Sequence, residues 1–495
     1  MTARVIDEVT ATAWTPYAEA HETHSAVVVL VGDRAYKFKK PVVTDFLDFG
    51  TLQRREIACA REVKLNSRLA PASYLGVAHI SDPAGGSAEP LVVMRRYPDS
   101  NRLARMAVNG EPLQHQLNAV AAALSRFHAG AHRGPEVDEQ GRVDAVTARW
   151  RANIAEMDPY VGSVVTAADV DRVSRLSTQY ITGRSRLFAH RISDNRIVDG
   201  HGDLLADDIF CQPDGPVLLD CLDFDDRLRY VDGIDDAAFL AMDLEFLGRA
   251  DLADYFLDQY SRLRGEDAPA SLKHFYIAYR ALVRAKVDCV RHAQGSAGAA
   301  KGAQRHLSLA ADHLSAGAVR VTLLGGAPGT GKTTLAHALA DRVDAVVISS
   351  DDVRRELQQA DVIGGEPGVL DSGLYSADKV QAVYDTVLRR ACGHLAHGRS
   401  VILDATWRYP GRRLRAHELA VQAHAAMVEL ACRSSFGVAT ARVRDRLPGT
   451  SDADLQIADA LGRHDDEWIT AHRVDTGRPL QECAEEAERL WRQAV

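Results

Sequence analysis

The chain has 495 residues, more than a single hydrophobic core usually holds, so two or three domains are expected. Hydrophobic residues make up 46% of it and charged residues 26%, an ordinary balance for a globular protein. The formal net charge of −9 argues against nucleic acid as a partner held by bulk electrostatics. Seven scattered cysteines without C-x-x-C spacing, no secretory signal and no apolar run of about 18 residues predict a cytoplasmic chain with free thiols that does not enter a membrane.

Strand signals come first in the chain, and helical patterns follow them. Short apolar or β-branched runs predict strands at Val27–Val31, Ala35–Lys40 and Leu91–Met94. Apolar residues at helical spacing predict helices at Gln53–Leu69, Leu117–His128 and from Asp236 to about His292. A group of strands with one helix, followed by mostly helices, predicts a bilobal α+β unit.

An acidic loop lies among these helical segments. Residues 201–208 read His-Gly-Asp-Leu-Leu-Ala-Asp-Asp, the pattern of a protein-kinase-type catalytic loop. Phosphoryl transfer to an alcohol needs one carboxylate beside the acceptor hydroxyl and others that hold magnesium against the nucleotide phosphates. Asp203 has the first position in this pattern, and Asp208 has the later position of a metal ligand.

This stretch, with the hairpin and the further aspartate after it, resembles the aminoglycoside phosphotransferase family, whose loop usually reads H-G-D-x-x-x-x-N. The resemblance covers about residues 20–290 and implies a bilobal ATP-dependent kinase. Asp208 stands where the family has Asn, and a carboxylate remains a competent magnesium ligand. For the second metal-holding aspartate, spacing slightly favours Asp220, at the end of the predicted strand Val217–Asp220. Asp223 looks more like the family's I-D-[FW] in its local context, and both could line the site.

The N-terminal strands supply candidates for phosphate binding. A kinase of this type needs a strand lysine for the nucleotide phosphates and a helix glutamate that holds the lysine. Lys37 and Lys39 share one face of their predicted strand, and Glu62 lies in the helix that follows. The order and distances match the family, so Lys37 with Glu62 is the predicted pair. Leu91–Arg96 occupies the position of the hinge between the lobes.

The second half of the chain follows a stretch of small residues. Residues 293–303 (AQGSAGAAKGA) read as a flexible linker, although Gln304–Leu314 still has a helical pattern that fits the first unit. The expected domains are residues 1–315, an aminoglycoside phosphotransferase-like kinase domain, and residues 316–495, a P-loop kinase-like domain. In the second domain, strands are predicted at Val319–Leu324, Ala345–Ile348, Val401–Leu403 and Met427–Cys432, with a helix at Lys379–His397. Alternating strands and helices predict an α/β fold with a doubly wound parallel sheet.

A nucleotide-binding motif opens this second domain. Residues 326–333 match the P-loop pattern G-x-x-x-x-G-K-[ST] at every position, between a predicted strand and an apolar helix. The predicted nucleotide-binding residues are Gly326, Ala327, Pro328, Gly329, Thr330, Gly331, Lys332, Thr333 and Thr334. Lys332 is expected to reach the β- and γ-phosphates, and the Thr333 hydroxyl to bind magnesium.

Two further segments point from nucleotide binding to phosphorylation of a small substrate. Ser349–Arg354 follows the second strand and resembles the acceptor side of P-loop small-molecule and polynucleotide kinases, which implies that Asp351 contacts the acceptor hydroxyl. Asp404 looks like the Walker B carboxylate of such kinases and is a predicted metal ligand. Arg442, Arg444 and Arg446 stand where these kinases keep lid arginines, and an ordinary solvated helix face explains the triplet almost equally well.

The whole chain resembles actinobacterial bifunctional proteins in which an aminoglycoside phosphotransferase domain is fused to a P-loop kinase domain. The leading hypothesis is an enzyme that uses ATP and Mg²⁺ to phosphorylate a small hydroxylated metabolite. One alternative is a nucleotide-gated regulatory protein with a degenerate N-terminal kinase fold, which Asp208 favours. Another is a nucleotide-sugar or polynucleotide kinase in the C-terminal half, whose nucleic-acid version the net acidity weakens. The sequence leaves the acceptor and the oligomeric state open.

Overall fold

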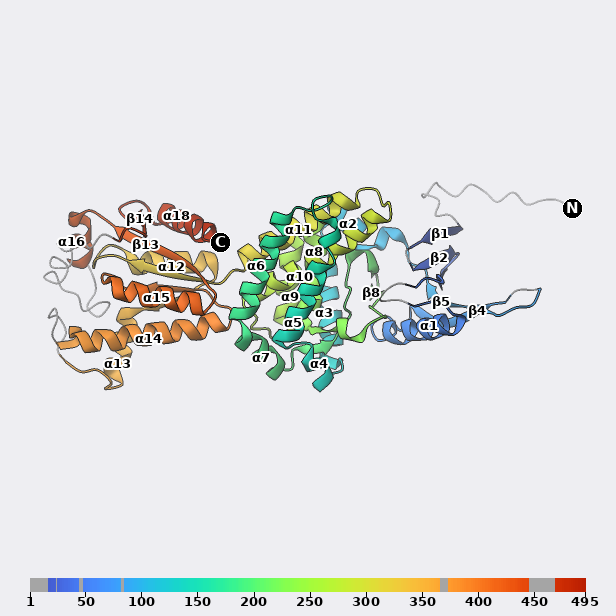
Figure 1. Cartoon of the computed structure of the whole chain (residues 1–495), viewed down its shortest axis with the longest axis horizontal. Coiled ribbons are helices and arrows are strands. Elements are labelled where there is room, and N and C mark those ends of the chain that lie inside the picture. Colours follow the sequence, from blue (N-terminus) through green and yellow to red (C-terminus); the bar gives the residue numbers. More distant parts are fainter. Residues whose placement is uncertain (1–16, 24, 44–47, 82–83, 366–372, 445–467) are drawn as a thin grey trace. The chain divides into compact units, whose positions relative to one another are not determined.

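The computed structural model describes residues 17–23, 25–43, 48–81, 84–365, 373–444 and 468–495 (Figure 1). The chain forms two compact units. The first combines residues 1–137 with 198–265, and the second combines residues 138–197 with 266–495. Each unit is therefore built from two separate stretches of sequence. The expected domains, 1–315 and 316–495, follow the sequence order instead and stay a proposal.

The first unit contains strands and helices from both of its stretches. Its strands are β1 (Ala18–Glu22), β2 (Ala26–Val31), β3 (Arg34–Lys39), β4 (Tyr74–Ile80), β5 (Glu89–Arg95), β6 (Ile197–Asp199), β7 (Ile209–Gln212), β8 (Gly215–Leu218) and β9 (Tyr230–Asp232). Its α-helices are α1 (Leu52–Asn66), α2 (Leu103–Val108), α3 (Gln114–Gly130), α8 (Gly233–Phe246) and α9 (Ala250–Arg264), and α4 (Pro135–Glu139) crosses the boundary to the second unit. Short 3₁₀ turns lie at Asp99–Asn101, Ala206–Asp208 and Asp226–Leu228.

An antiparallel sheet forms the N-terminal part of this unit. Its strand order is β1-β2-β3-β5-β4, and α1 packs on β4 and β5. The buried residues Ala35, Cys59, Val92 and Met94 close the core between sheet and helix. Thr51 caps α1 by accepting a hydrogen bond from the Arg54 amide, which satisfies one of the free donors of the first turn. The strands and the helix predicted for this region are confirmed.

A smaller group of elements lies within residues 197–246, and its first strand, β6, begins one residue before the boundary of the first unit. β7 and β8 form an antiparallel hairpin, and β6 pairs with β9. The buried helix α8 follows β9 directly, and the side chain of Asp232 caps its first turn through the Ile234 amide. The continuous helical pattern predicted from Asp236 to about His292 is broken in the structure into α8, α9 and a third helix, because left-handed Gly248 and Gly265 interrupt it.

The second unit contains a helical part and a parallel sheet. Its helices are α5 (Val143–Ala155), α6 (Ala167–Gly183), α7 (Ser185–Ser193), α10 (Ala270–Ala293), α11 (Ala299–Ala316), α12 (Lys332–Val343), α13 (Ser350–Gln359), α14 (Ala377–Ala396), α15 (Pro410–Gln422), α16 (Phe436–Arg444) and α18 (Leu480–Gln493). Its strands are β10 (Arg320–Gly325), β11 (Val346–Ser349), β12 (Val401–Asp404), β13 (Ala426–Arg433) and β14 (His472–Asp475). 3₁₀ turns lie at Asp158–Tyr160 and Gly373–Tyr375.

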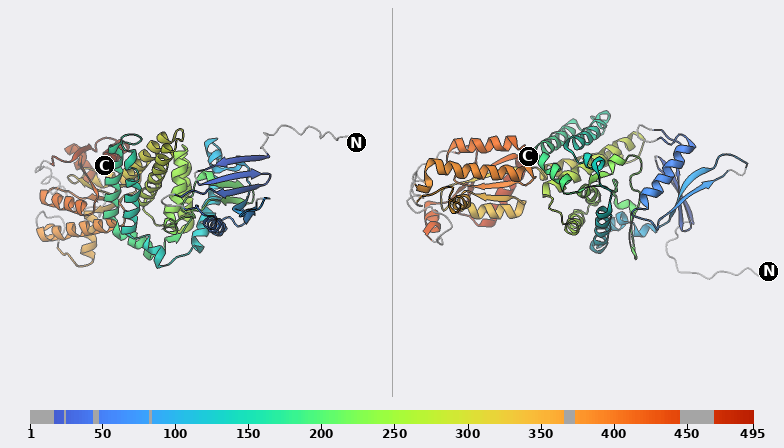
Figure 2. Two further views of the ribbon diagram at one scale, coloured as in Figure 1. Left: turned by 45° about the vertical axis from the view of Figure 1, so that its right-hand side comes forward. Right: turned by 90° about the horizontal axis from the view of Figure 1, so that it is seen from below.

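The sheet of the second unit is parallel throughout, in the order β11-β12-β10-β13-β14. Helices α12 and α18 cover one face and pack on each other, whereas α14 and α15 cover the other (Figures 1 and 2). The central strand β10 is buried along its whole length. This is the doubly wound arrangement that alternating strands and helices predict. Ligands bind at the carboxyl ends of the strands in such sheets, and the P-loop follows β10 there.

The predicted linker is partly wrong. Residues 299–303 begin α11 rather than a flexible connection, and Ala299 and Ala303 are buried. A Cβ atom at Gly302 would lie 2.6 Å from Asp288 of α10, so the small side chains allow the two helices to approach closely. The small residues therefore serve helix packing, a use that composition alone does not distinguish from flexibility.

Within the described residues, no helix is both long enough and apolar enough to cross a membrane. All seven cysteines lie in the described part of the chain, and none of them forms a disulfide.

Candidate active sites

In the first unit, Lys37 on β3 lies between two carboxylates. Its Nζ atom is 2.9 Å from Glu62 Oε1 and 2.8 Å from Asp220 Oδ1. Glu62 lies on α1 with its side chain 1% exposed, so its charge requires a cationic partner. The predicted pair of Lys37 with Glu62 is thus in contact, and Asp220 joins it from the segment after β8.

Lys39 makes a second set of ion pairs that the sequence did not assign. Its Nζ atom lies 2.6 Å from Glu62 Oε2 and 3.0 Å from Asp223 Oδ2, and the side chain is 5% exposed. Residues at i and i+2 of a strand share one face, so both lysines reach the same glutamate. The sequence did show that Lys39 lies on the same strand face as Lys37, which could have indicated a second lysine at this site. The burial of Lys39 could not be read from the sequence, because it depends on the approach of Asp223.

The two candidate aspartates therefore hold different lysines. Strand β8 ends at Leu218, so the predicted strand Val217–Asp220 is too long, and Asp220 adopts φ of +61° in the turn beyond it. The Asp220 amide donates to the Tyr74 hydroxyl over 3.2 Å, which fixes this turn. Lys37 is the main cause that holds the pKa of Asp220 below its usual range, although burial opposes it. Asp220 is ionised at neutral pH, as a metal or phosphate-orienting role requires.

The start of the loop 201–208 is hydrogen-bonded to the buried carboxylate of Asp236. Asp236 of α8 accepts hydrogen bonds from the backbone amides of His201 and Gly202 over 2.7 and 2.8 Å, and it contacts His128 Nε2 at 2.9 Å. Burial opposes its ionisation, but these partners hold the pKa of Asp236 well below the usual range. Gly202 has φ of +85°, and a Cβ there would lie 3.1 Å from the Arg229 side chain. This scaffold positions Asp203, which is half-buried.

Asp208 lies in an acidic environment at the end of this loop. Burial is the largest cause that raises the pKa of Asp208 well above its usual range, and Asp220, Asp203 and Asp207 add to it. Lys37 offsets only part of this effect. The surroundings of Asp208 thus combine burial with three neighbouring carboxylates. In the described part of the chain, no group of three or more His, Cys, Asp or Glu side chains is arranged to hold a metal ion.

In the second unit, the predicted P-loop joins β10 to α12. Three of its glycines have positive φ: Gly326 (+140°), Gly329 (+79°) and Gly331 (+80°). A Cβ at Gly326 would lie 2.6 Å from the Cys432 carbonyl oxygen, so the position requires glycine for space as well. The carbonyl of Ala327 accepts hydrogen bonds from the Thr330 hydroxyl and the Lys332 ammonium, over 2.7 and 3.0 Å. Pro328 is buried in the same turn.

Thr333 and Asp404 meet at the strand ends. The Thr333 hydroxyl donates a 2.6 Å hydrogen bond to Asp404 Oδ2 at the end of β12. Asp404 is buried, and this burial raises its pKa, while Lys332 and Thr333 counter part of the effect. Both side chains offer hard oxygen atoms, the ligands that magnesium prefers. The two predicted metal ligands of this unit are therefore side by side.

Asp351 lies at the carboxyl end of the neighbouring strand β11. Ser349 caps α13 by accepting from the amides of Asp351 and Asp352. Arg354, buried one turn later, donates to Asp351 over 2.7 Å and fixes its carboxylate. Asp351 and Asp352 also contribute to the raised pKa of Asp404, after the larger effect of burial.

Aromatic and basic residues beside this edge were missed by sequence reasoning. Tyr384 of α14 makes a 3.3 Å hydrogen bond with Thr406, just after β12. The Arg412 guanidinium stacks on the rings of Tyr384 and Tyr409 at 4.5 and 4.7 Å. The sequence does show a cluster of arginines after β12. The same cluster is also typical of an exposed helix start, so it did not indicate a site.

A cavity of about 310 Å³ lies beside the P-loop. It is lined by Gly329, Gly331, Thr334, Leu335, Arg442, Thr476, Arg478, Leu480 and Cys483. Arg442 reaches it from α16 and donates to the Thr476 carbonyl over 3.0 Å. Arg444 is exposed on the same helix, and Arg446 lies outside the described residues. The cavity therefore borders two glycines of the P-loop.

The sequence of the second unit matches a known domain family. Residues 321–462 match the AAA domain family AAA_33. The chain is also 54% identical to the uncharacterized proteins Rv2004c of Mycobacterium tuberculosis and Mb2027c of Mycobacterium bovis. Each match spans 480 residues, 97% of this chain and 96% of the relative. The chain belongs to this mycobacterial protein family. Family membership covers both units, because the match extends over nearly the whole length.

Solved structures similar to this chain fall into two groups. A choline/ethanolamine kinase family protein from Mesorhizobium loti covers 61% of this chain and 93% of its own, with 16% identity and a TM-score of 0.39. The GDP and kanamycin complex of APH(2")-IIIa covers 60% and 92%, with 14% identity and a TM-score of 0.40. A sugar kinase from Janibacter sp. HTCC2649 covers 35% and 94%, with 16% identity and a TM-score of 0.28.

Proposed function

We propose that this family member is an ATP- and Mg²⁺-dependent phosphotransferase whose acceptor is a small hydroxylated metabolite. The observation that carries the proposal is the 2.6 Å hydrogen bond between Thr333 and Asp404 beside the P-loop. A P-loop hydroxyl next to a Walker B carboxylate is the arrangement that P-loop enzymes use for magnesium. Magnesium usually keeps several waters and takes only one or two protein ligands, so this pair fits it.

The second unit offers a complete set of groups for phosphoryl transfer. The P-loop amides and Lys332 would bind the nucleotide phosphates, and Thr333 with Asp404 would hold magnesium, which neutralises developing phosphate charge. Asp351, which accepts a hydrogen bond from Arg354, would accept the proton of an acceptor hydroxyl. Arg442 at the neighbouring cavity would contribute positive charge near the nucleotide, and Arg446 keeps the same proposed role.

The first unit contains a second group of side chains that we propose for phosphoryl transfer. Lys37, held by Glu62, would bind nucleotide phosphates once Asp220 turns to a metal ion. Asp203 would contact the acceptor hydroxyl, and Asp208 with Asp220 would hold magnesium. Asp223, which is paired with Lys39, is the alternative to Asp220 as the second metal ligand. The whole chain is then an aminoglycoside phosphotransferase-like kinase joined to a P-loop kinase, with the boundary near residue 315.

A nucleotide-gated sensor is the second candidate function. Asp208 favours it, because a carboxylate stands where the resembled family has Asn, and Asp220, Asp203 and Asp207 already surround it with negative charge. In that case the first unit binds ATP without turnover, and only the P-loop unit transfers phosphate.

The test is a metabolite-pool phosphorylation screen with the full-length chain, ATP and magnesium, followed by mass spectrometry of the products. Lys332→Ala and Asp203→Asn variants, screened separately, assign each product to a unit. A product lost in Asp203→Asn supports activity of the first unit. Products that depend only on Lys332 support the sensor alternative, and the absence of any phosphorylated product contradicts the phosphotransferase proposal.

A further inference from the structure

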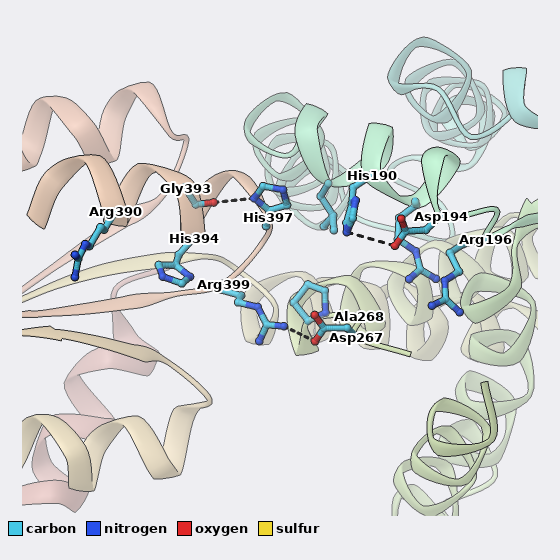
Figure 3. Close-up of a pocket in the computed structure, with 13 residues that line it drawn as sticks. His190, Asp194, Arg196, Asp267, Ala268, Arg390, Gly393, His394, His397 and Arg399 are labelled. Atoms are coloured by element: carbon cyan, nitrogen blue, oxygen red, sulfur yellow. Dashed lines mark hydrogen bonds and ion pairs between the residues drawn. The ribbon is translucent and has the colours of Figure 1, made fainter. Parts of the chain in front are cut away.

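A second cavity, of about 360 Å³, lies in the second unit among α7, α10 and α14 (Figure 3). It is lined by Leu187, His190, Arg191, Asp194, Arg196, Asp267, Ala268, Pro269, Arg390, Gly393, His394, His397 and Arg399. None of these residues belongs to the P-loop or to the edge formed by Asp351 and Asp404. The cavity is thus separate from the site proposed for nucleotide and acceptor in this unit.

The walls of the cavity are joined by close contacts. Ser271, in the first turn of α10, donates a 2.6 Å hydrogen bond to the Gly398 carbonyl. Gly398 has φ of +78°, and a Cβ there would lie 3.1 Å from the Leu187 side chain, so the loop after α14 is seated tightly on α7. Arg184, fully buried just before α7, donates to the Ala423 carbonyl over 2.8 Å. These contacts define a cavity with fixed walls.

Basic side chains dominate the lining. Four arginines and three histidines face two aspartates, Asp194 and Asp267. Arg399 lies 2.6 Å from Asp267, whose side chain is 94% exposed, so water weakens this ion pair. Arg390 is paired with Glu356 of α13, outside the lining, and both side chains are partly exposed.

Two more arginines of the lining share one carboxylate partner outside it. Arg191 and Arg196 contact the two oxygens of buried Glu266 at 2.6 and 3.2 Å. Burial, followed by the neighbouring Arg399 and His397, lowers the pKa of His394. Every arginine of the lining thus has a carboxylate partner, and Arg390 and Arg399 are the two whose ion pairs are the most exposed. Figure 3 shows His394, His397 and Arg399 on one side, and His190 and Arg196 on the other.

We propose that this cavity binds a small phosphorylated metabolite. Its volume lies near the lower end of the range for small-molecule sites, about 300–1,000 Å³. A guanidinium group has five N–H donors in a planar fork that matches phosphate oxygens, so Arg390 and Arg399 can each keep a carboxylate partner and still bind an anion. A bound phosphate then connects the C-terminal end of α14 with α7 and stabilises the junction between them.

A structural explanation of the same residues makes a different prediction. Helices α7 and α14 both end at the cavity, and basic residues in a last turn offset the partial negative charge of a helix C-terminus. If that were their whole role, the cavity would hold water and no anion. The binding experiment separates the two explanations.

The experiment measures pyrophosphate binding to the full-length chain by hydrogen–deuterium exchange and calorimetry. Pyrophosphate is expected to slow exchange in peptides covering residues 187–199 and 390–399, apart from any effect at the P-loop. Sulfate and glucose serve as comparison probes, a generic anion and a neutral sugar. Protection confined to residues 326–334, or equal protection by glucose, would overturn the proposal.

Three variants make the result specific. Arg399→Ala is expected to weaken pyrophosphate binding at this cavity about tenfold or more, the usual effect of losing one charge-assisted hydrogen bond. Arg389→Ala changes an arginine of α14 that does not line the cavity, and it is expected to leave binding unchanged. Asp267→Asn breaks the same ion pair but keeps Arg399, so binding is expected to persist or tighten. Equal loss in Asp267→Asn and Arg399→Ala would show a structural role only.

Discussion

Lys37 Nζ lies 2.8 Å from Asp220 Oδ1, although 183 residues separate the two positions. The contact joins β3 to the turn after β8. Lys37 thus forms ion pairs with both Glu62 and Asp220. In a kinase of the proposed type, the lysine serves phosphate and the aspartate serves metal. The ion pair therefore keeps both groups charged and in place before any nucleotide enters. Bound ATP and magnesium would exchange this contact for their own.

Lys332→Ala is expected to reduce nucleotide turnover at the P-loop by two orders of magnitude or more, as the loss of one positioned charge at a transferring phosphate does. Lys332 Nζ contacts the Ala327 carbonyl and packs in no core, so the melting temperature should change little. Steady-state turnover in an Asp203→Asn background measures the P-loop unit alone. Lys379→Ala, which removes a lysine bound to the Gly373 carbonyl, is the matched control. An unchanged rate in Lys332→Ala would refute the assignment.

Asp203→Asn is expected to abolish phosphoryl transfer by the first unit while ATP affinity changes by less than about threefold. Asp203 is assigned to the acceptor hydroxyl, whereas Lys37 and Asp220 serve the nucleotide and metal. Both effects are measured in a Lys332→Ala background: equilibrium ATP binding gives the affinity, and product formation gives the rate of phosphoryl transfer. Asp207→Asn alters the exposed neighbouring carboxylate and should retain activity. Collapse of ATP binding with intact transfer per bound nucleotide would mean that the roles are reversed.

Asp208→Asn is expected to keep or raise the activity of the first unit, whereas Asp208→Ala should lower magnesium affinity and turnover together. An amide oxygen still binds magnesium, and the substitution removes one charge from a group that already includes Asp203, Asp207 and Asp220. Magnesium titrations of ATP binding compare the three proteins. Equal magnesium dependence of wild type and Asp208→Ala would exclude Asp208 as a ligand. Absence of turnover in all three, with ATP still bound, would favour the sensor.

Asp236→Asn is expected to lower the free energy of unfolding by about 3 kcal/mol at pH 7, because a buried carboxylate that accepts from His201, Gly202 and His128 loses its charge. The folded pKa of Asp236 is depressed, so its contribution is complete above the unfolded value of about 3.9 and declines as the pH falls below it. Urea unfolding of wild type and variant between neutral and acidic pH measures this. Asp258→Asn, on the exposed face of α9, serves as the control. A difference that grows on acidification would contradict the assignment.

The sequence predicted the site best where the functional residues are close together in the chain. The P-loop, its strand and its helix are contiguous, so the pattern of residues 326–333 predicted their geometry directly. Lys37 and Glu62 were also predictable, because a strand lysine and a helix glutamate keep a fixed order. Lys39 was passed over, since its burial follows from the position of Asp223, which no local pattern reveals.

Tertiary structure determined the remaining features. Asp220 takes a left-handed turn beyond β8, whereas spacing alone predicted that the strand continued to Asp220. The small residues at 299–303 form a close helix contact, and composition alone predicted flexibility. The basic cavity combines residues from separate segments around positions 190, 267 and 395, and only the fold brings them together.

The central claim, transfer of phosphate from ATP to a small hydroxylated acceptor, is tested most directly with γ-labelled ATP and a metabolite extract. The measurement compares label in organic phosphate with label in inorganic phosphate for wild type and for the Lys332→Ala, Asp203→Asn double variant. The account predicts magnesium-dependent label in an organic product with wild type and none with the double variant. Label released only as inorganic phosphate, or equal organic label with both proteins, would contradict it.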